Sequence, residues 1–240
     1  MHLNLTFPVI ITQLLNGFAL GMLFTLMAVG LTIILGLMRV INFTHGVLYT
    51  LGAYALITLQ KYVGFWPMLA IAPICVGAIG MALEASMIRP LYKRDPLHTL
   101  LVTFGMALVI EDVIRLIWGD IPYPLDAPQI LSGVVNLGIA YFSKYRIFLI
   151  IFTTILLFGV WLLLEKTQLG KTILAGTFDR EMVVILGIKI DLLFTLVFGI
   201  GAGLAAIAGV LASPIRGVFP PMGTDIVMPS FVVVIIGGMG

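Results

Sequence analysis

The chain has 240 residues, of which 61% are hydrophobic and only 10% are charged, and its net charge at pH 7 is +2. Soluble domains carry about 25% charged residues, so this composition, with a mean hydropathy of +1.18, excludes a soluble domain and indicates an integral membrane protein. The apolar runs are about 20 residues long rather than alternating strands of about ten, which indicates transmembrane helices and not a membrane barrel.

Several classes of site are excluded by residue type. One cysteine, Cys75, and three histidines exclude a disulfide framework and a Cys/His metal cluster. The sequence has no GxxxxGK[ST] phosphate loop, so any ATP that drives this protein must be bound by another polypeptide. We expect no cofactor in this chain and no nucleic-acid partner. The N-terminus lacks a basic region and a small-residue cleavage site, so no signal peptide is predicted.

Four apolar runs make up the first half of the chain. The first, residues 7–40, is too long for one perpendicular span, so it is either one long tilted helix or a span followed by a broken segment. Pro90 and Pro96 stop helices on either side of a basic cluster. The other three runs are 47–62, 66–88 and 97–118.

The second half alternates polar segments with apolar runs. A proline-containing polar loop at 119–146 precedes runs at 147–164 and 192–211. Residues 212–230 are rich in Gly and Pro and form either a surface loop or a re-entrant segment, since unpaired backbone is tolerated at membrane depth only where it faces protein or water. The last run, Phe231–Gly240, is about half of what a bilayer needs, so we expect the sequence to be incomplete at its C-terminus.

These runs predict an all-α fold: one polytopic transmembrane domain over residues 1–240, with about 7–8 transmembrane helices and, as an open alternative, a re-entrant or broken segment. Basic residues set the orientation, because cytoplasmic loops carry more of them. The richer side is therefore expected to be cytoplasmic and the N-terminus outside. The richer side holds Arg39, Arg89, Lys93, Arg94, Lys166, Lys171, Arg180 and Lys189, and the other holds Lys61, Arg115, Lys144, Arg146 and Arg216.

A polar stretch at 170–189 interrupts the apolar runs on the predicted cytoplasmic side. Asp179 is a good helix N-cap and Gly187 a good residue to follow a helix end, and an apolar stripe between them has helical spacing (Met182, Ile185 and Leu186). The pattern predicts a helix of about two turns. A helix this short is marginal alone, so it must dock, either on the membrane face of its own chain or in a groove of a separate motor subunit.

Polar residues follow the first long run at Asn42–Gly46. Asn42 and His45 are three residues apart and would share a face of a helix. They would either cap the backbone where a helix breaks or line a polar path for a substrate. Both alternatives stay open.

Ionisable residues within the apolar runs are candidates for function by default. Glu111 and Arg115 have the spacing of a helical charge pair near an outer helix end, with Asp112 beside them. They either anchor the interface or act in transport. Glu84 lies one turn before Arg89, where pairing or snorkelling explains it better than ion coupling.

Ordered motifs along nearly the whole chain resemble the permease subunits of branched-chain amino acid ABC importers, and most closely the H-type (Liv) subunit. Residues 41–46 followed by 52–54 are similar to that family's NFxHG…GAY signature. The remaining matches, in chain order, are Arg89-Pro90-Leu91; Thr103-Phe104-Gly105; Gly170, Ala175, Asp179, Leu186, Gly187 and Ile188; Ala205-Ala206; Ala208-Gly209-Val210-Leu211; Pro221-Met222-Gly223; and Ile236-Gly237-Gly238-Met239-Gly240. Two positions depart from the family pattern, Thr44 for alanine and Leu174 for arginine, and the second puts one ATPase contact in doubt.

The resemblance implies a bacterial inner-membrane importer, and in that membrane the outside position predicted for the N-terminus from the basic residues is periplasmic. Its implied partners are a second homologous permease, two cytoplasmic ATPases that bind ATP-Mg, a periplasmic substrate-binding protein and membrane lipid. It implies a cargo of branched-chain amino acids, with urea or short amides as alternatives. On the matching positions it implies ATPase coupling at Gly170, Ala175, Asp179, Leu186 and Gly187, and a substrate pathway or gate at Asn42, His45 and Gly46.

Two other classes of function would use different residues. An ion-coupled secondary carrier would use Glu84, Glu111 or Asp112 at membrane depth and would need no ATPase. A membrane enzyme would need a converging nucleophile, base or metal set, and the sequence shows none.

Overall fold

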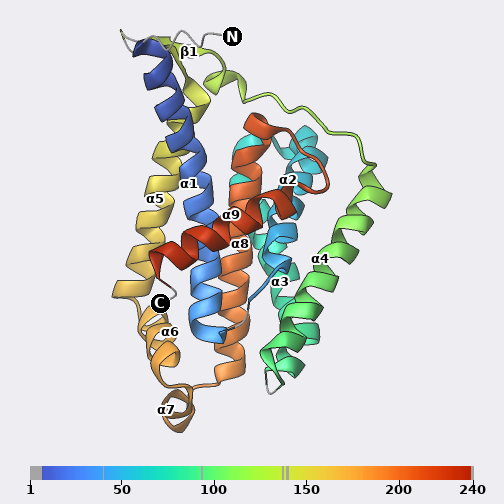
Figure 1. The fold of residues 1–240 in the computed structure, drawn as a ribbon, viewed down its shortest axis with the longest axis vertical. Helices are drawn as coiled ribbons and strands as arrows, with labels where there is room; N and C mark the ends of the chain where they lie inside the picture. Colours follow the sequence, from blue (N-terminus) through green and yellow to red (C-terminus); the bar gives the residue numbers. More distant parts are fainter. Residues whose placement is uncertain (1–6, 40, 93, 137, 139–140, 239–240) are drawn as a thin grey trace.

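The computed structural model describes residues 7–39, 41–92, 94–136, 138 and 141–238, and it is a bundle of helices (Figure 1). The elements in chain order are α1 (Phe7–Met38), α2 (Thr44–Val63), α3 (Phe65–Leu83), the π-helical turn η1 (Glu84–Ile88), the 3-10 turn η2 (Arg89–Leu91), α4 (Pro96–Trp118), the 3-10 turn η3 (Gln129–Leu131), β1 (Val134–Asn136), β2 (Tyr141–Ser143), α5 (Lys144–Lys166), α6 (Gln168–Phe178), α7 (Arg180–Ile185), α8 (Ile190–Arg216) and α9 (Met222–Gly237). The predicted all-α, polytopic fold class is confirmed.

Four helical segments of the described chain are long and apolar enough to cross a membrane: Phe7–Met38, Phe65–Leu91, Lys144–Lys166 and Ile190–Arg216. Of the two alternatives for the first run, one long helix is correct, because α1 is continuous over 32 residues. At about 1.5 Å per residue it is about 48 Å long. That exceeds a hydrocarbon core of about 30 Å, so α1 must tilt or extend beyond it.

Helix α8 is the centre of the bundle and packs against α1, α2 and α3 (Figure 1). Every residue from Gly201 to Ser213 is buried. Small residues allow this, because a Cβ atom on Gly209 would overlap the carbonyl oxygen of Tyr49 in α2, and one on Gly52 would overlap Ala206 in α8. The backbones of α2 and α8 therefore touch directly, as small residues permit in membrane helix pairs.

Of the two alternatives for residues 212–230, the surface loop is wrong, because most of the segment is helical. Helix α8 continues to Arg216, and α9 begins at Met222 and crosses the bundle obliquely (Figure 1). Pro214 and Pro229 lie inside these helices, where proline is tolerated in membrane proteins because neighbouring groups satisfy the freed carbonyls. The last apolar run is thus the second half of α9; Met239 and Gly240 lie outside the described residues.

The predicted polar loop 119–146 contains the β1–β2 hairpin, and α5 begins within it, at Lys144 rather than at 147. Tyr123 forms an antiparallel bridge with Val218 in the α8–α9 connection. This bridge places the two polar connections at the same end of the bundle, opposite to α6 and α7 (Figure 1). Of the basic residues used for orientation, Lys93 lies outside the described residues.

Candidate functional site

The polar stretch 170–189 folds into most of α6 and all of α7, at one end of the bundle (Figure 1). Helix α6 was not predicted, although it has a local signal: the Thr167 hydroxyl accepts a hydrogen bond from the Gly170 amide at 3.1 Å and caps the helix. A Cβ atom on Gly170 would overlap the carbonyl oxygens of Leu163 and Leu164. Only glycine fits there, so Gly170 lets α6 turn back tightly from α5.

The predicted short helix is confirmed as α7. Oδ1 of Asp179 accepts a hydrogen bond from the Met182 amide at 3.0 Å. At the other end Gly187 has a φ of +81°, and the Ile188 amide donates to the Val183 carbonyl at 3.3 Å. This is a glycine-terminated helix end in the left-handed conformation that glycine favours.

The apolar stripe of α7 is left largely uncovered by the described residues. Val183 is buried, but the side chains of Met182, Ile185 and Leu186 are 52%, 76% and 70% exposed. We call the exposed residues Met182, Ile185 and Leu186, together with the exposed Phe178, the α7 face. An exposed apolar patch on a helix that is capped at both ends indicates a surface that another molecule covers.

Two arginines attach this segment to the end of α1. Arg180 donates to the Leu37 carbonyl at 2.6 Å, and its guanidinium lies over the Phe194 ring of α8, 5.2 Å from the centroid. Arg39 donates to the Thr177 carbonyl at 3.3 Å. Burial, and secondarily the nearby charge of Arg39, lowers the pKa of Arg180. These contacts hold α7 in one position relative to α1 and α8.

The second predicted region, Asn42–Gly46, is the break between α1 and α2. Oδ1 of Asn42 accepts from the Thr44 amide at 3.0 Å and so satisfies the first amide of α2, although the N-cap residue of that helix is Phe43. Helix α2 begins only at Thr44, so Asn42 precedes the helix, and the shared helix face predicted for Asn42 and His45 is wrong. The Thr44 hydroxyl donates to the Thr103 carbonyl of α4 at 3.0 Å, so the threonine that departs from the family pattern ties the break to α4.

Buried polar atoms without partners gather at this break. Asn42 is 1% exposed and His45 is fully buried, and neither Nδ2 of Asn42 nor either ring nitrogen of His45 has a hydrogen-bond partner among the described residues. His45 packs on Gly30 of α1, and Gly46 packs on Gly223 in the first turn of α9. The break therefore joins α1, α2, α4 and α9 around unpaired polar groups, which are costly to bury.

The structure does not bring the two predicted regions into contact. They are connected through the chain, because residues 38–41 lie between Leu37, which Arg180 binds, and Asn42. Of the other predicted coupling positions, Ala175 accepts a hydrogen bond from the Asp179 amide at 2.9 Å. Leu174, the other departure from the family pattern, is exposed on α6.

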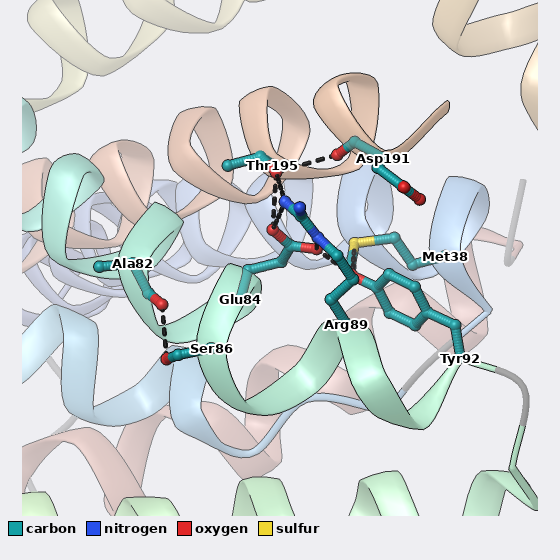
Figure 2. Close-up of polar contacts among 8 residues, drawn as sticks. All are labelled: Met38, Ala82, Glu84, Ser86, Arg89, Tyr92, Asp191 and Thr195. Carbon is teal, nitrogen blue, oxygen red and sulfur yellow. Dashed lines mark hydrogen bonds and ion pairs between the residues drawn. The ribbon is translucent and has the colours of Figure 1, made fainter. Parts of the chain in front are cut away.

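The charged pairs predicted within the apolar runs are confirmed. Arg115 lies 2.6 Å from Glu111, and Glu111 also accepts a hydrogen bond from Thr224 of α9 at 3.0 Å. Arg89 lies 3.0 Å from Glu84, which is fully buried and does not snorkel (Figure 2). The inter-helix partners, Thr224 and Thr195, had no signal in the sequence. Among the described residues, no cluster of His, Cys, Asp or Glu could hold a metal ion.

Comparisons with known proteins find relatives of a single family. A family model described as "Branched-chain amino acid transport system / permease component" matches residues 13–240. The high-affinity branched-chain amino acid transport system permease protein BraD of Pseudomonas aeruginosa is 30% identical over 95% of this chain and 79% of its own length. LivH of Salmonella typhimurium is 28% identical over the same shares, and the probable permease LivH of Methanocaldococcus jannaschii is 28% identical over 90% of this chain and 70% of its own.

No solved structure matches the chain. The family match covers nearly the whole chain, and four described helices are apolar enough to span a membrane. The chain belongs to the branched-chain amino acid transport system permease family, and is therefore a membrane transport permease and not an enzyme.

Proposed function

We propose that this chain is one of two homologous permease subunits of an ATP-driven importer, and that it forms half of the translocation pore. The cargo is a branched-chain amino acid, as the names of BraD and LivH state for those relatives. Two ATPase subunits bind ATP-Mg on the α6–α7 side, which is then cytoplasmic. A periplasmic binding protein delivers the cargo to the opposite end, where the 119–143 and 217–221 connections lie, and the N-terminus is periplasmic in an inner membrane.

The exposed α7 face is the observation that carries this proposal. The six residues of α7 are too few for a stable isolated helix, yet Asp179 and Gly187 cap it and Arg180 fixes it to α1 and α8. A preformed amphipathic helix with its apolar side uncovered fits the mode in which a helix docks into a groove of a partner. The segment 170–188 is thus the coupling surface for the ATPase.

The break at Asn42–Gly46 is proposed as the gate. Its unpaired Asn42 and His45 nitrogens are costly while the helices are closed, and separation of α1, α2 and α9 would expose them to a passing substrate or to water. Interrupted helices whose ends meet within the membrane line the substrate sites of several transporter folds. Gly46 and Gly223 permit the close helix contact that such a movement would break.

The coupling proposal is tested by crosslinking in the complete transporter, assembled with its ATPases in lipid nanodiscs. In a Cys75→Ser background, because Cys75 is itself exposed, an Ile185→Cys variant is labelled with a thiol-reactive photo-crosslinker that on illumination inserts into the chain beside it. An Ile155→Cys variant is the matched control, because Ile155 is a similarly exposed isoleucine (65% against 76%) on α5, which crosses the membrane. We expect a crosslink to the ATPase from residue 185 and none from residue 155. Failure of residue 185 to crosslink, with ATPase present in the complex, would contradict the proposal.

A further assay separates this function from the alternatives. In vesicles we expect uptake to require ATP and to persist after the proton gradient is collapsed. Uptake that follows the gradient and ignores ATP would select an ion-coupled carrier. Competition by urea or short amides, with none by leucine or valine, would reassign the cargo.

A further inference from the structure

A partly buried polar cluster lies where the end of α3 meets the beginning of α8 (Figure 2). We call Glu84, Arg89, Tyr92 and Thr195 the Glu84 cluster. Glu84 is the first residue of the π-helical turn η1 and is fully buried. A buried carboxylate is stable only when it is paired and hydrogen-bonded, so its partners show what it holds in place.

Both oxygens of the Glu84 carboxylate accept hydrogen bonds. Oε2 accepts from Arg89 at 3.0 Å and from the Thr195 hydroxyl at 2.7 Å, and Oε1 accepts from the Tyr92 hydroxyl at 2.7 Å. Arg89 also donates to the Thr195 hydroxyl. Partial burial, and next the hydrogen bond to Glu84, raises the pKa of Tyr92, which keeps its hydroxyl protonated as a donor.

The π turn explains how Arg89 reaches Glu84. In an α-helix residues five apart lie about 140° apart around the axis, since each turn takes 3.6 residues. A π turn joins residue i to i+5, and here the Arg89 amide donates to the Glu84 carbonyl. The wider turn therefore aligns the two side chains. Glu84, Arg89 and Tyr92 thus all lie just after α3, whereas Thr195 belongs to α8.

The same region meets the segment that carries α7. Phe194, next to Thr195, packs edge-on against the Tyr92 ring, with centroids 5.0 Å apart. Phe194 also contacts the Arg180 guanidinium of α7. A continuous path of contacts thus runs from α7 through Arg180 and Phe194 to Tyr92 and Glu84.

Hydrogen bonds to a charged, buried group are short and directional, and roughly twice as strong as neutral ones. Apolar contacts between helices permit small sliding movements, whereas separating Thr195 from Glu84 breaks a hydrogen bond to a buried charge, although the Thr195 hydroxyl keeps the Asp191 carbonyl as an acceptor at 2.9 Å. Movement of the start of α8 and the end of α3 as one unit keeps this bond, and their separation loses it.

We propose that the Glu84 cluster is the linkage that passes a displacement of α7 to α3, with Glu84 and Thr195 as positioning residues. This inference rests on the proposed coupling function of the 170–188 segment. The linkage couples ATP hydrolysis in the partner to the opening of the bundle.

Thr195→Val tests the linkage without unpairing a charge, because valine has the shape of threonine and Arg89 still neutralises Glu84. Thr154→Val is the matched control, because both hydroxyls donate to the carbonyl four residues earlier, at 2.9 Å for Thr195 and 2.8 Å for Thr154. Thr154, however, is exposed on α5 and has no other hydrogen-bond partner among the described residues. The complete transporter carrying each variant is assayed in proteoliposomes for substrate uptake, ATP hydrolysis and melting temperature.

We expect Thr195→Val to lower the substrate transported per ATP at least about fivefold, with assembly and melting temperature close to those of Thr154→Val. Tyr92→Phe should act in the same direction. If the amount of substrate transported per ATP hydrolysed equals that of the control, the linkage is overturned. A lower melting temperature with an unchanged amount of substrate per ATP would also overturn it, because it would show a purely structural role.

The residue-185 crosslink in the same preparation distinguishes the two proposals. If Ile185→Cys crosslinks to the ATPase while Thr195→Val behaves like the control, the linkage is wrong and the coupling surface stands. If residue 185 never crosslinks, the coupling surface is wrong and the linkage falls with it.

Discussion

Replacing Asp179 by alanine removes the side chain that caps α7. The capping bond, from the Met182 amide to Oδ1 at 3.0 Å, is exposed to solvent, and loss of such a cap costs about 1 kcal/mol of helix stability. A difference of this size changes a folded population about fivefold. Because α7 has only six residues, no surplus of helix stability compensates for the loss.

We therefore expect Asp179→Ala to weaken binding of the ATPase to the permease about fivefold, and to lower uptake in proportion. Asp179→Asn is the control, since asparagine caps helices about as well as aspartate but carries no charge. Its Kd for the ATPase, measured with the permease in nanodiscs, should stay within about twofold of the original. The reasoning is refuted if alanine leaves the Kd unchanged, or if asparagine is as damaging as alanine, which would make charge rather than capping the cause.

Three further predictions follow from the structure. Gly209→Val should destabilise the bundle by about 1–3 kcal/mol, because the valine Cβ would overlap the Tyr49 carbonyl. Gly159→Ala on α5 should be tolerated, because the space around Gly159 is open. The yield and melting temperature of the purified protein measure both effects. Arg180→Gln should speed amide hydrogen exchange in α6 and α7 about tenfold, since a charge-assisted bond of about 1.5–3 kcal/mol is lost, and unchanged exchange would contradict the attachment seen here. Burial raises the pKa of Tyr92 above its ordinary 10, so the stability that its hydroxyl contributes should be complete below about pH 10 and lost as the pH rises further, and melting temperatures of Tyr92→Phe should lack that alkaline loss.

The local elements of the coupling segment could be predicted from the sequence because their signals are local. Asp179 and Gly187 act on backbone groups within four residues, and both ends of α7 lie where these residues place them. Helix α9 was missed for the converse reason. The Pro and Gly residues of 212–230 favour loops in water, but a membrane bundle supplies the neighbours that let Pro214 and Pro229 remain in helices.

The site was predictable only within single segments. The members of the pairs Glu84–Arg89 and Glu111–Arg115 are five and four residues apart along the chain, and both pairs form. Their partners Thr195 and Thr224 are more than 100 residues away along the chain, and nothing in either threonine's neighbourhood marks it as a hydrogen-bond partner of a buried glutamate. Likewise, the π turn that brings Arg89 over Glu84 has no composition signal, since it depends on how the end of α3 packs against α8.

The most direct test is the exposed fraction of the α7 face in a structure of the complete transporter. In the isolated chain Ile185 is 76% exposed and Leu186 is 70% exposed. We predict that both become buried in a groove of the ATPase, with the backbone of α7 unchanged. If the ATPase is bound elsewhere, and Ile185 and Leu186 remain exposed or face lipid, the central claim is contradicted.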